Sequence, residues 1–415
     1  MQSPSSRVGQ YRIPFNRASF GLAEMHYAGQ ALYSGHVSGD GHFTGQCREF
    51  FERRFAGSHA LLTTSCTHAL ELSALLLDIQ PGDEVLVPSF TFVSTVNAFV
   101  LRGARPVFVD IRPDTLNFDE TVAAAKITSR TKAMVPVHYA GVGCEMDAIM
   151  ALAARYGIPV VEDNAHGLFG RYKGKDLGRF GALSTLSFHE TKNISCGEGG
   201  ALIINDPALA GRAEILREKG TNRSQFFRGT VDKYTWVDQG SSYLPSDILA
   251  SVLYAQLERS EQIQNQRRRV WQTYRAGLAD AAKRCGARLP FVPAHCEQAY
   301  HMFYMILPDL KMRQGLIEHL KRKGICAVFH YVPLHAAPMG QRFGARPGEC
   351  PVTESVSDRL VRLPFYADLS EADQGAVIDA VIEFLAQGRG RVRTRQRIPV
   401  PAPGFSDVPD RRQTA

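Results

Sequence analysis

"SFHETKNISCGEGG", residues 187–200, places a single lysine, Lys192, shortly after a β-prone run that ends near Phe188. A glycine-rich patch with one acid, Glu198, follows the lysine. In an open α/β sheet, ligands bind beyond the carboxyl ends of the strands. Lys192 therefore stands where such a sheet places a functional side chain.

Short β-prone runs alternate with helical segments along most of the chain before and after this stretch. The runs expected to be strands are ALLTTS, EVLVPS, PVFVD, AMVPVH, IPVVED, LSTLSF and GALIIN. The segments between most of them have a helical period, as in THALELSALLLD and MDAIMALAARYG. Strands separated by helices of roughly ten to fifteen residues predict βαβ units, and so an α/β fold with a mostly parallel central sheet flanked by helices.

The order of elements changes near residue 250, where a long helical stretch leads out of the sheet region. We expect a large domain with an N-terminal arm over residues 1–250 and a smaller C-terminal α+β domain over residues 251–387. Residues 388–415 are rich in arginine and proline and have no amphipathic period, so we expect them to form a disordered basic tail.

Most of the positive charge lies in that tail. The formal net charge of the chain is +7, and residues 388–415 hold seven arginines and two aspartates, a net +5. The rest of the chain is therefore close to neutral, which argues against a nucleic-acid-binding surface. Contact of the tail itself with phosphate or with a membrane surface stays open.

Cysteine spacing and hydropathy also limit the class of protein. The eight cysteines include no C-x-x-C pair, and His189-Glu190 lacks the spacing of a zinc-binding H-E-x-x-H motif, so neither a disulfide framework nor a metal site is predicted. The first residues contain no apolar stretch typical of a secretory signal, and no run is long enough for membrane insertion. We expect a cytoplasmic protein.

Four polar segments follow expected strands: TTSCTH (63–68), SFTF (89–92), EDNAH (162–166) and SFHETK (187–192). Backbone N–H groups in the first could cradle a phosphate at a helix N-terminus, although Ser and Thr are also ordinary N-caps. Asp163 ends an apolar strand, where a carboxylate needs a cation or several hydrogen bonds. Phe92 is either a core aromatic or a ring that stacks on a ligand.

These segments take complementary roles if the cation beside Asp163 is the ring nitrogen of pyridoxal 5′-phosphate (PLP). Lys192 would form the Schiff base, and Asp163 would keep the ring nitrogen protonated, so that the ring serves as an electron sink. The TTSCTH cradle and Ser187 would bind the phosphate, and Phe92 would stack on the ring. The combination predicts a PLP enzyme with Lys192 as its catalytic residue.

The sequence resembles the nucleotide-sugar aminotransferases of the DegT/StrS type, which have the fold-type I fold of aspartate aminotransferase. The motifs that carry the resemblance are GDEVLVPSFTFVST (82–95), PVVEDNAHG (159–167) and SFHETKNISCGEGGALIIND (187–206). It implies a homodimer and alternation of the cofactor with pyridoxamine phosphate (PMP). The further cofactor contacts that it implies are Cys66, Thr67, His166 and, reaching across from the partner subunit, Ser242. His166 stands where many relatives have glutamine, and Cys66 where glycine is commoner.

Within that family, three more segments look like the dTDP-4-amino-4,6-dideoxygalactose transaminases: residues 135–147, 217–247 and 328–335. This similarity implies transfer of the amino group of L-glutamate to C4 of dTDP-4-keto-6-deoxyglucose, in a pathway to a surface polysaccharide. The residues that would contact substrate are Lys219, Arg223, Arg228, His330, Tyr331 and His335. For the cations a solvated surface is the alternative, and for the histidines a structural role.

Two other functions fit parts of the sequence. A sugar dehydratase with the same cofactor would have histidine in place of Lys192, so the lysine argues against it. A non-catalytic regulator that binds nucleotide sugar or nucleic acid would not need both Lys192 and Asp163. The sequence leaves open the configuration at C4 of the product, the nucleotide base, the oligomeric state beyond a dimer and the role of the tail.

Overall fold

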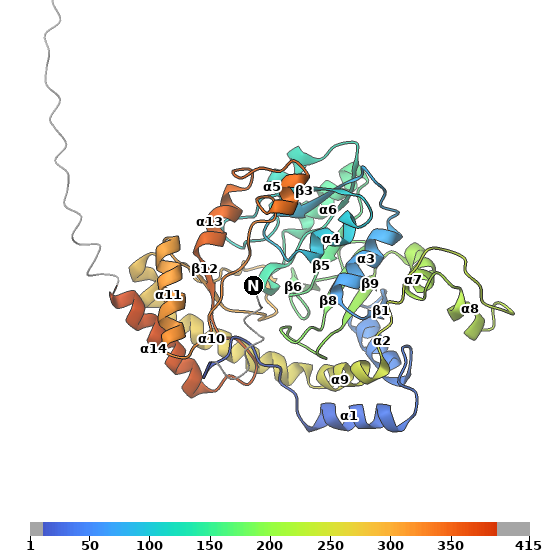
Figure 1. Cartoon of the computed structure of the whole chain (residues 1–415), viewed down its shortest axis with the longest axis horizontal. Helices are drawn as coiled ribbons and strands as arrows, with labels where there is room; N and C mark the ends of the chain where they lie inside the picture. Colours follow the sequence, from blue (N-terminus) through green and yellow to red (C-terminus); the bar gives the residue numbers. More distant parts are fainter. Residues whose placement is uncertain (1–10, 388–415) are drawn as a thin grey trace, which may run out of the picture.

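A seven-stranded sheet forms the centre of the protein, which a computed structural model describes over residues 11–387 (Figure 1). Across the sheet the strands are β1 (His59–Thr63), β9 (Gly200–Ile204), β8 (Leu183–Ser187), β5 (Val161–Asp163), β4 (Thr131–Met134), β2 (Glu84–Pro88) and β3 (Arg105–Val109). Isolated bridges from Met134 to Val160 and from Val137 to Asp163 join β4 to β5. Only β9 runs antiparallel to its neighbours in this described sheet, so the expectation of a mostly parallel sheet is confirmed.

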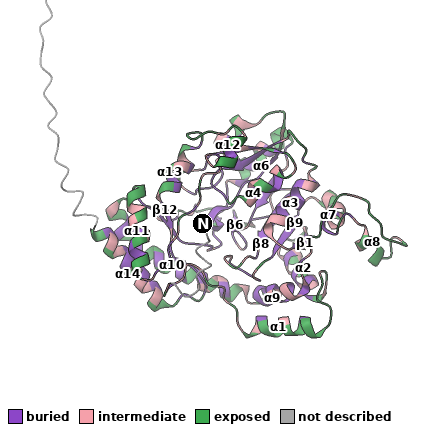
Figure 2. Ribbon diagram, viewed as in Figure 1, coloured by how far each residue is buried: buried purple, intermediate pink, exposed green. Residues whose placement is uncertain are grey.

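Alternate residues of the strands pack on opposite faces of the sheet, as the two-residue period of a strand requires. In β1, Leu61 belongs to one hydrophobic cluster and Leu62 to another. The helices on the Leu61 face are α3 (Cys66–Leu76), α4 (Ser94–Val100) and α7 (Ala210–Arg217). Those on the opposite face are α2 (His42–Arg54), α6 (Met146–Tyr156) and α9 (Asp247–Glu258). Buried residues therefore fill both sides of the sheet (Figure 2).

A separate hydrophobic cluster forms the core of a smaller C-terminal domain. Its elements are α10 (Ser260–Cys285), α11 (Leu310–Arg322), α14 (Glu371–Gln387) and a two-stranded sheet of β11 (Tyr304–Ile306) and β12 (Leu360–Arg362). Ile263 still packs with the large domain, whereas Val270 packs with the small one. The change of packing partner therefore lies within α10 rather than at residue 250, because α9 buries its apolar face against α1 and α2.

The remaining elements connect or border these two parts. They are α1 (Leu22–Tyr33), α5 (Glu120–Ala123), α8 (Arg223–Phe227), α12 (Pro338–Arg342), α13 (Pro351–Arg359), β6 (Arg171–Tyr172), β7 (Lys175–Asp176) and β10 (Cys296–Glu297). None of the helices within residues 11–387 is both long and apolar enough to span a bilayer. The tail predicted for residues 388–415 lies outside the described residues.

Gly200 allows the first turn of α3 to lie directly against the sheet. The glycine opens β9, between Thr63 of β1 and Ser187 of β8. A Cβ atom at position 200 would overlap the backbone of Ser65 and Cys66. Because position 200 has no side chain, the start of α3 can lie close to the carboxyl ends of β1 and β8. Any larger residue at this position must displace the start of α3.

Replacing Gly200 by alanine is therefore expected to destabilise the protein. We predict that Gly200→Ala lowers the free energy of unfolding by about 1–3 kcal/mol, because backbone must move to admit the methyl group. The matched control is Gly211→Ala in α7, where a Cβ meets no atom within 4 Å. The control should leave stability unchanged or raise it by up to about 1 kcal/mol. Denaturant unfolding followed by circular dichroism measures both, and equal stability of the two variants would contradict the packing described here.

Candidate active site

The predicted functional segments meet at the carboxyl ends of β1, β5 and β8. Thr63, Gly200 and Ser187 are aligned across three neighbouring strands. Two residues before Ser187, Thr185 pairs with Asp163 at the end of β5. The start of α3, Ser187 and Asp163 therefore lie at one edge of the sheet, as the sequence predicts.

Asp163 is a buried carboxylate without a cation in contact. The residue is 5% exposed, and its Oδ2 accepts a hydrogen bond of 2.7 Å from the Thr95 hydroxyl. Its Oδ1 accepts one from the backbone N–H of Ala165 at 3.1 Å. Within residues 11–387 no Lys, Arg or His nitrogen lies within 4.0 Å of it. A buried carboxylate in this state is stabilised by a positively charged ligand group.

The residue before Asp163 fixes the end of β5. Both carboxylate oxygens of Glu162 are fully buried and accept hydrogen bonds from His138 Nε2 and from the backbone N–H groups of Gly178, Phe180 and Gly181. His138 Nδ1 accepts from the backbone N–H of Cys144, so the ring carries its proton on Nε2. This network gives His138 a structural role and holds the strand end that presents Asp163.

Lys192 lies in the turn after β8, near Asp163 and Cys66. Burial lowers the pKa of its amine, and the carboxylate of Asp163 partly opposes that effect. A lowered pKa increases the fraction of uncharged amine near neutral pH. Uncharged lysine is the form that acts as a nucleophile and as a base.

The start of α3 forms a cradle of N–H groups beside Ser187. Ser65 is the N-cap, and its hydroxyl accepts from the backbone N–H of His68. The Thr67 hydroxyl donates to Ser94 Oγ at 2.8 Å. Burial raises the pKa of the Cys66 thiol to about 12, so the thiol stays neutral and adds no negative charge to the cradle. The helix N-terminus is therefore free to attract an anion.

His166 stacks on a histidine from the small domain that sequence reasoning missed. The rings of His166 and His301 lie 4.2 Å apart at 13°. His301 Nδ1 bonds Asn193 Oδ1, next to Lys192, at 2.8 Å. The pKa of His166 is held well below its usual value, chiefly by burial and then by Lys192, so its ring is neutral. Its Nδ1 is buried without a hydrogen-bond partner, which leaves it available to a ligand hydroxyl or oxyanion.

A group of aromatic residues also lies near the site. Phe92 is 57% exposed, so it is not the core aromatic that the sequence left as an alternative. Its ring lies 6.5 Å from Tyr331, whose own neighbour His330 accepts from or donates to the Tyr139 hydroxyl at 3.0 Å. Phe92, His330 and Tyr331 therefore belong to one group of rings near the site.

The predicted cations of residues 217–228 are not brought next to Lys192 within one chain. They lie around α8, which projects from the body of the molecule (Figure 1). Lys219 and Arg223 pair with Glu218, and Arg228 pairs with Glu214 through two hydrogen bonds. Ser242 is exposed at the base of the same segment, bridged to Glu218.

His335 has a structural environment in this fold. The residue is fully buried, its Nδ1 bonds the Ser89 hydroxyl at 2.6 Å, and its Nε2 bonds Glu354 at 2.8 Å. Both ring nitrogens are occupied, so neither is free for a substrate. The geometry therefore favours the structural alternative for His335.

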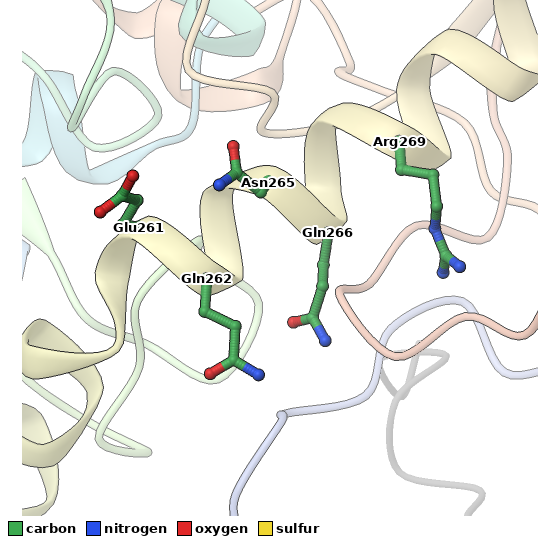
Figure 3. Close-up of a pocket in the computed structure, with 5 residues that line it drawn as sticks. All are labelled: Glu261, Gln262, Asn265, Gln266 and Arg269. Carbon is green, nitrogen blue, oxygen red and sulfur yellow. The ribbon is translucent and has the colours of Figure 1, made fainter.

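A surface hollow elsewhere contains none of the predicted residues. Figure 3 shows its lining, which comes entirely from α10: Glu261, Gln262, Asn265, Gln266 and Arg269. Within residues 11–387, no three His, Cys, Asp or Glu side chains group as metal ligands. The candidate catalytic and cofactor-binding residues therefore lie around Lys192 and not in this hollow.

The residues around Lys192 fit PLP on three observations. Asp163 lacks a cation that a protonated ring nitrogen would supply. His166 Nδ1 lacks the partner that a ring hydroxyl would supply. Gly200 lets the N–H groups at the start of α3 lie against the sheet beside Ser187, where a phosphate would bind. Each of these open positions matches a different polar group of the cofactor.

Comparison with known proteins agrees with this fit. The model of the DegT/DnrJ/EryC1/StrS aminotransferase family matches residues 21–382. The aminotransferase TlmJ from Streptoalloteichus hindustanus is 31% identical, with a TM-score of 0.83 over 91% of this chain and 100% of its own. Spr1654 from Streptococcus pneumoniae, assigned as a sugar aminotransferase, is 25% identical in its PMP form, with a TM-score of 0.84 over 91% and 100% of the two chains. It is also known in a PLP form.

A protein of Methanocaldococcus jannaschii, MJ1066, is 35% identical over 348 residues, 82% of this chain and 89% of the relative. The family match spans both domains and every predicted cofactor contact. With the arrangement around Lys192, it establishes that the chain belongs to the DegT/DnrJ/EryC1/StrS aminotransferase family and is a PLP-dependent transaminase with the fold of that family.

Proposed function

We propose that this aminotransferase moves the amino group of L-glutamate to C4 of dTDP-4-keto-6-deoxyglucose, giving dTDP-4-amino-4,6-dideoxygalactose and 2-oxoglutarate. The observation that carries the transfer chemistry is the grouping of Lys192, Asp163 and the α3 cradle at one sheet edge. The identity of the sugar is supported by the similarity of residues 135–147, 217–247 and 328–335 to transaminases with that substrate.

The side chains around the cofactor have distinct tasks in this reaction. Bound PLP supplies an electron sink for the bond that breaks next to the transferred amine. Asp163 would keep the ring nitrogen protonated, and Thr95 orients Asp163 through its hydrogen bond. Lys192 would hold the cofactor covalently, and its lowered pKa would provide an uncharged amine able to carry the proton at the reacting carbon. The α3 cradle and Ser187 anchor the phosphate.

The residues proposed to contact substrate fall into two groups, one near Lys192 and one around α8. His330 and Tyr331 lie in the ring group that also contains Phe92, close to the cofactor site. Lys219, Arg223 and Arg228 are exposed cations on the segment around α8, suited to a diphosphate if that segment reaches a neighbouring site. Their partners Glu218 and Glu214 would have to share them with the ligand.

A homodimer would bring that segment to a second active site. Large apolar residues are exposed on α1 and around α8, where much of the ribbon in Figure 2 has the green of exposed residues. They include Leu22 at 82%, Met25 at 71%, Phe227 at 70% and Trp236 at 75% exposure. Exposed apolar groups of this size are typical of a protein–protein interface. Ser242 would then contact the phosphate in the partner's site, as the family resemblance implies.

The dimer is tested by the mass of the purified protein in solution. Light scattering after size-exclusion chromatography should give about twice the 45.8 kDa of one chain. The double substitution Leu22→Glu and Met25→Glu should shift the mass toward one chain, because charge in an apolar interface is costly. A wild-type mass of one chain at micromolar concentration would contradict the proposed dimer.

Removal of the Lys192 amine tests its catalytic role. We predict that Lys192→Ala lowers kcat by at least about a thousandfold, because it removes both the covalent attachment and the proton carrier. The visible absorbance of the lysine-bound cofactor should disappear as well, while circular dichroism stays unchanged. Lys175→Ala, at an exposed lysine of β7, is the control and should retain wild-type activity. Wild-type turnover by Lys192→Ala would refute the assignment.

The proposed substrate and product are tested by incubation with L-glutamate and dTDP-4-keto-6-deoxyglucose. The expected result is equal amounts of 2-oxoglutarate and a dTDP-4-amino sugar whose proton NMR couplings show the galacto configuration. Formation of the gluco product would show that the amino group is delivered to the other face of C4, and would correct the proposed configuration of the product. No product from this sugar, with turnover of another nucleotide-linked keto-sugar, would overturn the proposed acceptor and leave the transaminase assignment intact.

A further inference from the structure

A buried side chain, Asn193, attaches the turn after β8 to the segment that leads into β11 of the small domain. Its Nδ2 donates to the Ala299 carbonyl at 2.6 Å, and its Oδ1 lies 2.8 Å from His301 Nδ1. Asn193 and His301 are each 7% exposed, so these bonds are shielded from water. The two domains are therefore joined at the residue that follows Lys192.

The bonding of Asn193 determines where His301 has its proton. A side-chain amide offers N–H donors on its nitrogen and an acceptor on its oxygen. Because Asn193 Nδ2 donates to a carbonyl, its Oδ1 faces the imidazole and accepts from Nδ1 of His301. Burial holds the pKa of His301 well below its usual value, so the ring is neutral and Nδ1 is its single N–H donor. His301 is therefore the donor of this pair.

The segment that contains His301 is itself held in a fixed conformation. Tyr300 has a φ of 52°, in the left-handed region that residues with a side chain rarely adopt. Arg267 of α10 donates to the Tyr300 carbonyl at 3.0 Å and to the His301 carbonyl at 2.6 Å. The Ala299 carbonyl accepts from Asn193. Three successive carbonyls thus have donors, so Asn193 is bonded to a well-anchored piece of backbone.

The turn after β8 has few hydrogen bonds of its own beside Lys192. The N–H of Lys192 donates to the His189 carbonyl at 2.9 Å, and the N–H of Cys196 to the Phe188 carbonyl at 3.0 Å. Within residues 11–387, no hydrogen bond starts from the backbone N–H groups of residues 193–195. Ile194 packs in the core of the large domain. Without the Asn193 bonds, this stretch would be held mainly by apolar packing.

His301 also contacts a second residue of the candidate site. Its ring stacks on His166 at 4.2 Å, with the two planes at 13°. Nδ1 of His166 is buried without a hydrogen-bond partner and is expected to meet the ring hydroxyl of the cofactor. One small-domain histidine therefore touches both the residue next to Lys192 and a residue expected to contact PLP.

We propose that His301, acting through Asn193, positions Lys192 against the bound cofactor. The inference rests on the proposed function, because it requires Lys192 to bind the cofactor and carry the proton. A lysine side chain is flexible, so the place of its amine depends on how its backbone is held. A misplacement of about 1 Å in a reacting group can lower a rate about a hundredfold. The α3 cradle and Asp163 would hold the cofactor, and Asn193 holds the turn from which the lysine approaches it.

The test compares two His301 variants of the PLP-loaded enzyme by stopped-flow absorbance. His301→Phe keeps a ring against His166 but has no N–H donor. His301→Asn has no ring but keeps an N–H donor on the atom bonded to Cγ, where Nδ1 stood. His301→Phe should lower the rate constant for reaction with L-glutamate by about tenfold to a hundredfold and change its apparent Kd by less than about twofold. His301→Asn should react within about threefold of the wild type.

The geometry of the bound cofactor gives a readout that does not depend on activity. Visible circular dichroism of the lysine-bound cofactor reports how firmly its ring is oriented by the protein. The signal should weaken in His301→Phe and persist in His301→Asn. In the cofactor-free protein, hydrogen exchange of the peptide over residues 188–197 should be faster in His301→Phe than in the wild type.

A double-mutant cycle tests whether His301 acts through Asn193. Asn193→Ala should lower the same rate constant as His301→Phe, and the double variant should lose no more than Asn193→Ala alone, because both changes break one bond. The matched control is Gln374→Ala, which removes a buried amide that donates to the Val270 carbonyl at 2.6 Å between α14 and α10. It should reduce stability but leave the rate constant and the visible signal unchanged.

Three results would overturn the proposal. They are a wild-type rate in folded His301→Phe or Asn193→Ala, equal losses in His301→Phe and His301→Asn, and additive losses in the double variant. If His301→Phe does not fold, Asn193→Ala and His301→Asn provide the same comparison of a broken and a retained bond.

Reduction with borohydride and peptide mass spectrometry distinguish failure of this proposal from failure of the proposed function. The wild type should have the cofactor fixed to Lys192. Attachment at another lysine would reject the proposed role of Lys192 and this inference with it. Attachment at Lys192 with wild-type behaviour of the His301 variants would refute the positioning role alone. If another amino acid is the donor, it replaces L-glutamate in the assay, and the keto-sugar does not enter the test.

Discussion

The carboxylate of Asp163 is buried at the end of β5 with two hydrogen bonds and no cation in contact. Much of the surrounding structure serves to keep it there. The hydrogen bond between His138 and Glu162 fixes the end of β5, and Thr95 of α4 donates a hydrogen bond to Asp163. A buried negative charge in this position is unfavourable until a positive group joins it. The ring nitrogen of bound PLP would supply that charge, so the environment of Asp163 fits the cofactor of this family.

Both domains contribute to the site. The large domain provides Lys192, Asp163 and the cradle at the start of α3, all from segments that follow strands. The small domain adds His301, which stacks on His166. Asn193 joins the two parts through its hydrogen bonds to His301 and to the Ala299 carbonyl. A change in the packing of the small domain would therefore change the position of Asn193, the residue next to Lys192.

Sequence reasoning predicted that the large-domain candidates meet at one edge of the sheet, and the structure brings them together there. Lys192, Asp163 and Cys66 follow β-prone runs, and the geometry of a parallel sheet brings the carboxyl ends of such runs together. The antiparallel direction of β9 could not be read from GALIIN, because the pattern of a buried strand carries no direction. His301 was missed because it lies more than a hundred residues beyond Lys192 and belongs to no local motif. His335 was predicted to contact substrate, but Ser89 and Glu354 occupy its ring nitrogens.

The central claim, that amino groups pass through a PLP site at Lys192, is tested most directly by the absorbance spectrum of the PLP-loaded protein. The visible band should fade when L-glutamate is added and return when dTDP-4-keto-6-deoxyglucose follows. Fading without return would keep the site and reject the sugar. A cofactor-loaded protein whose spectrum responds to no amino acid would contradict the claim.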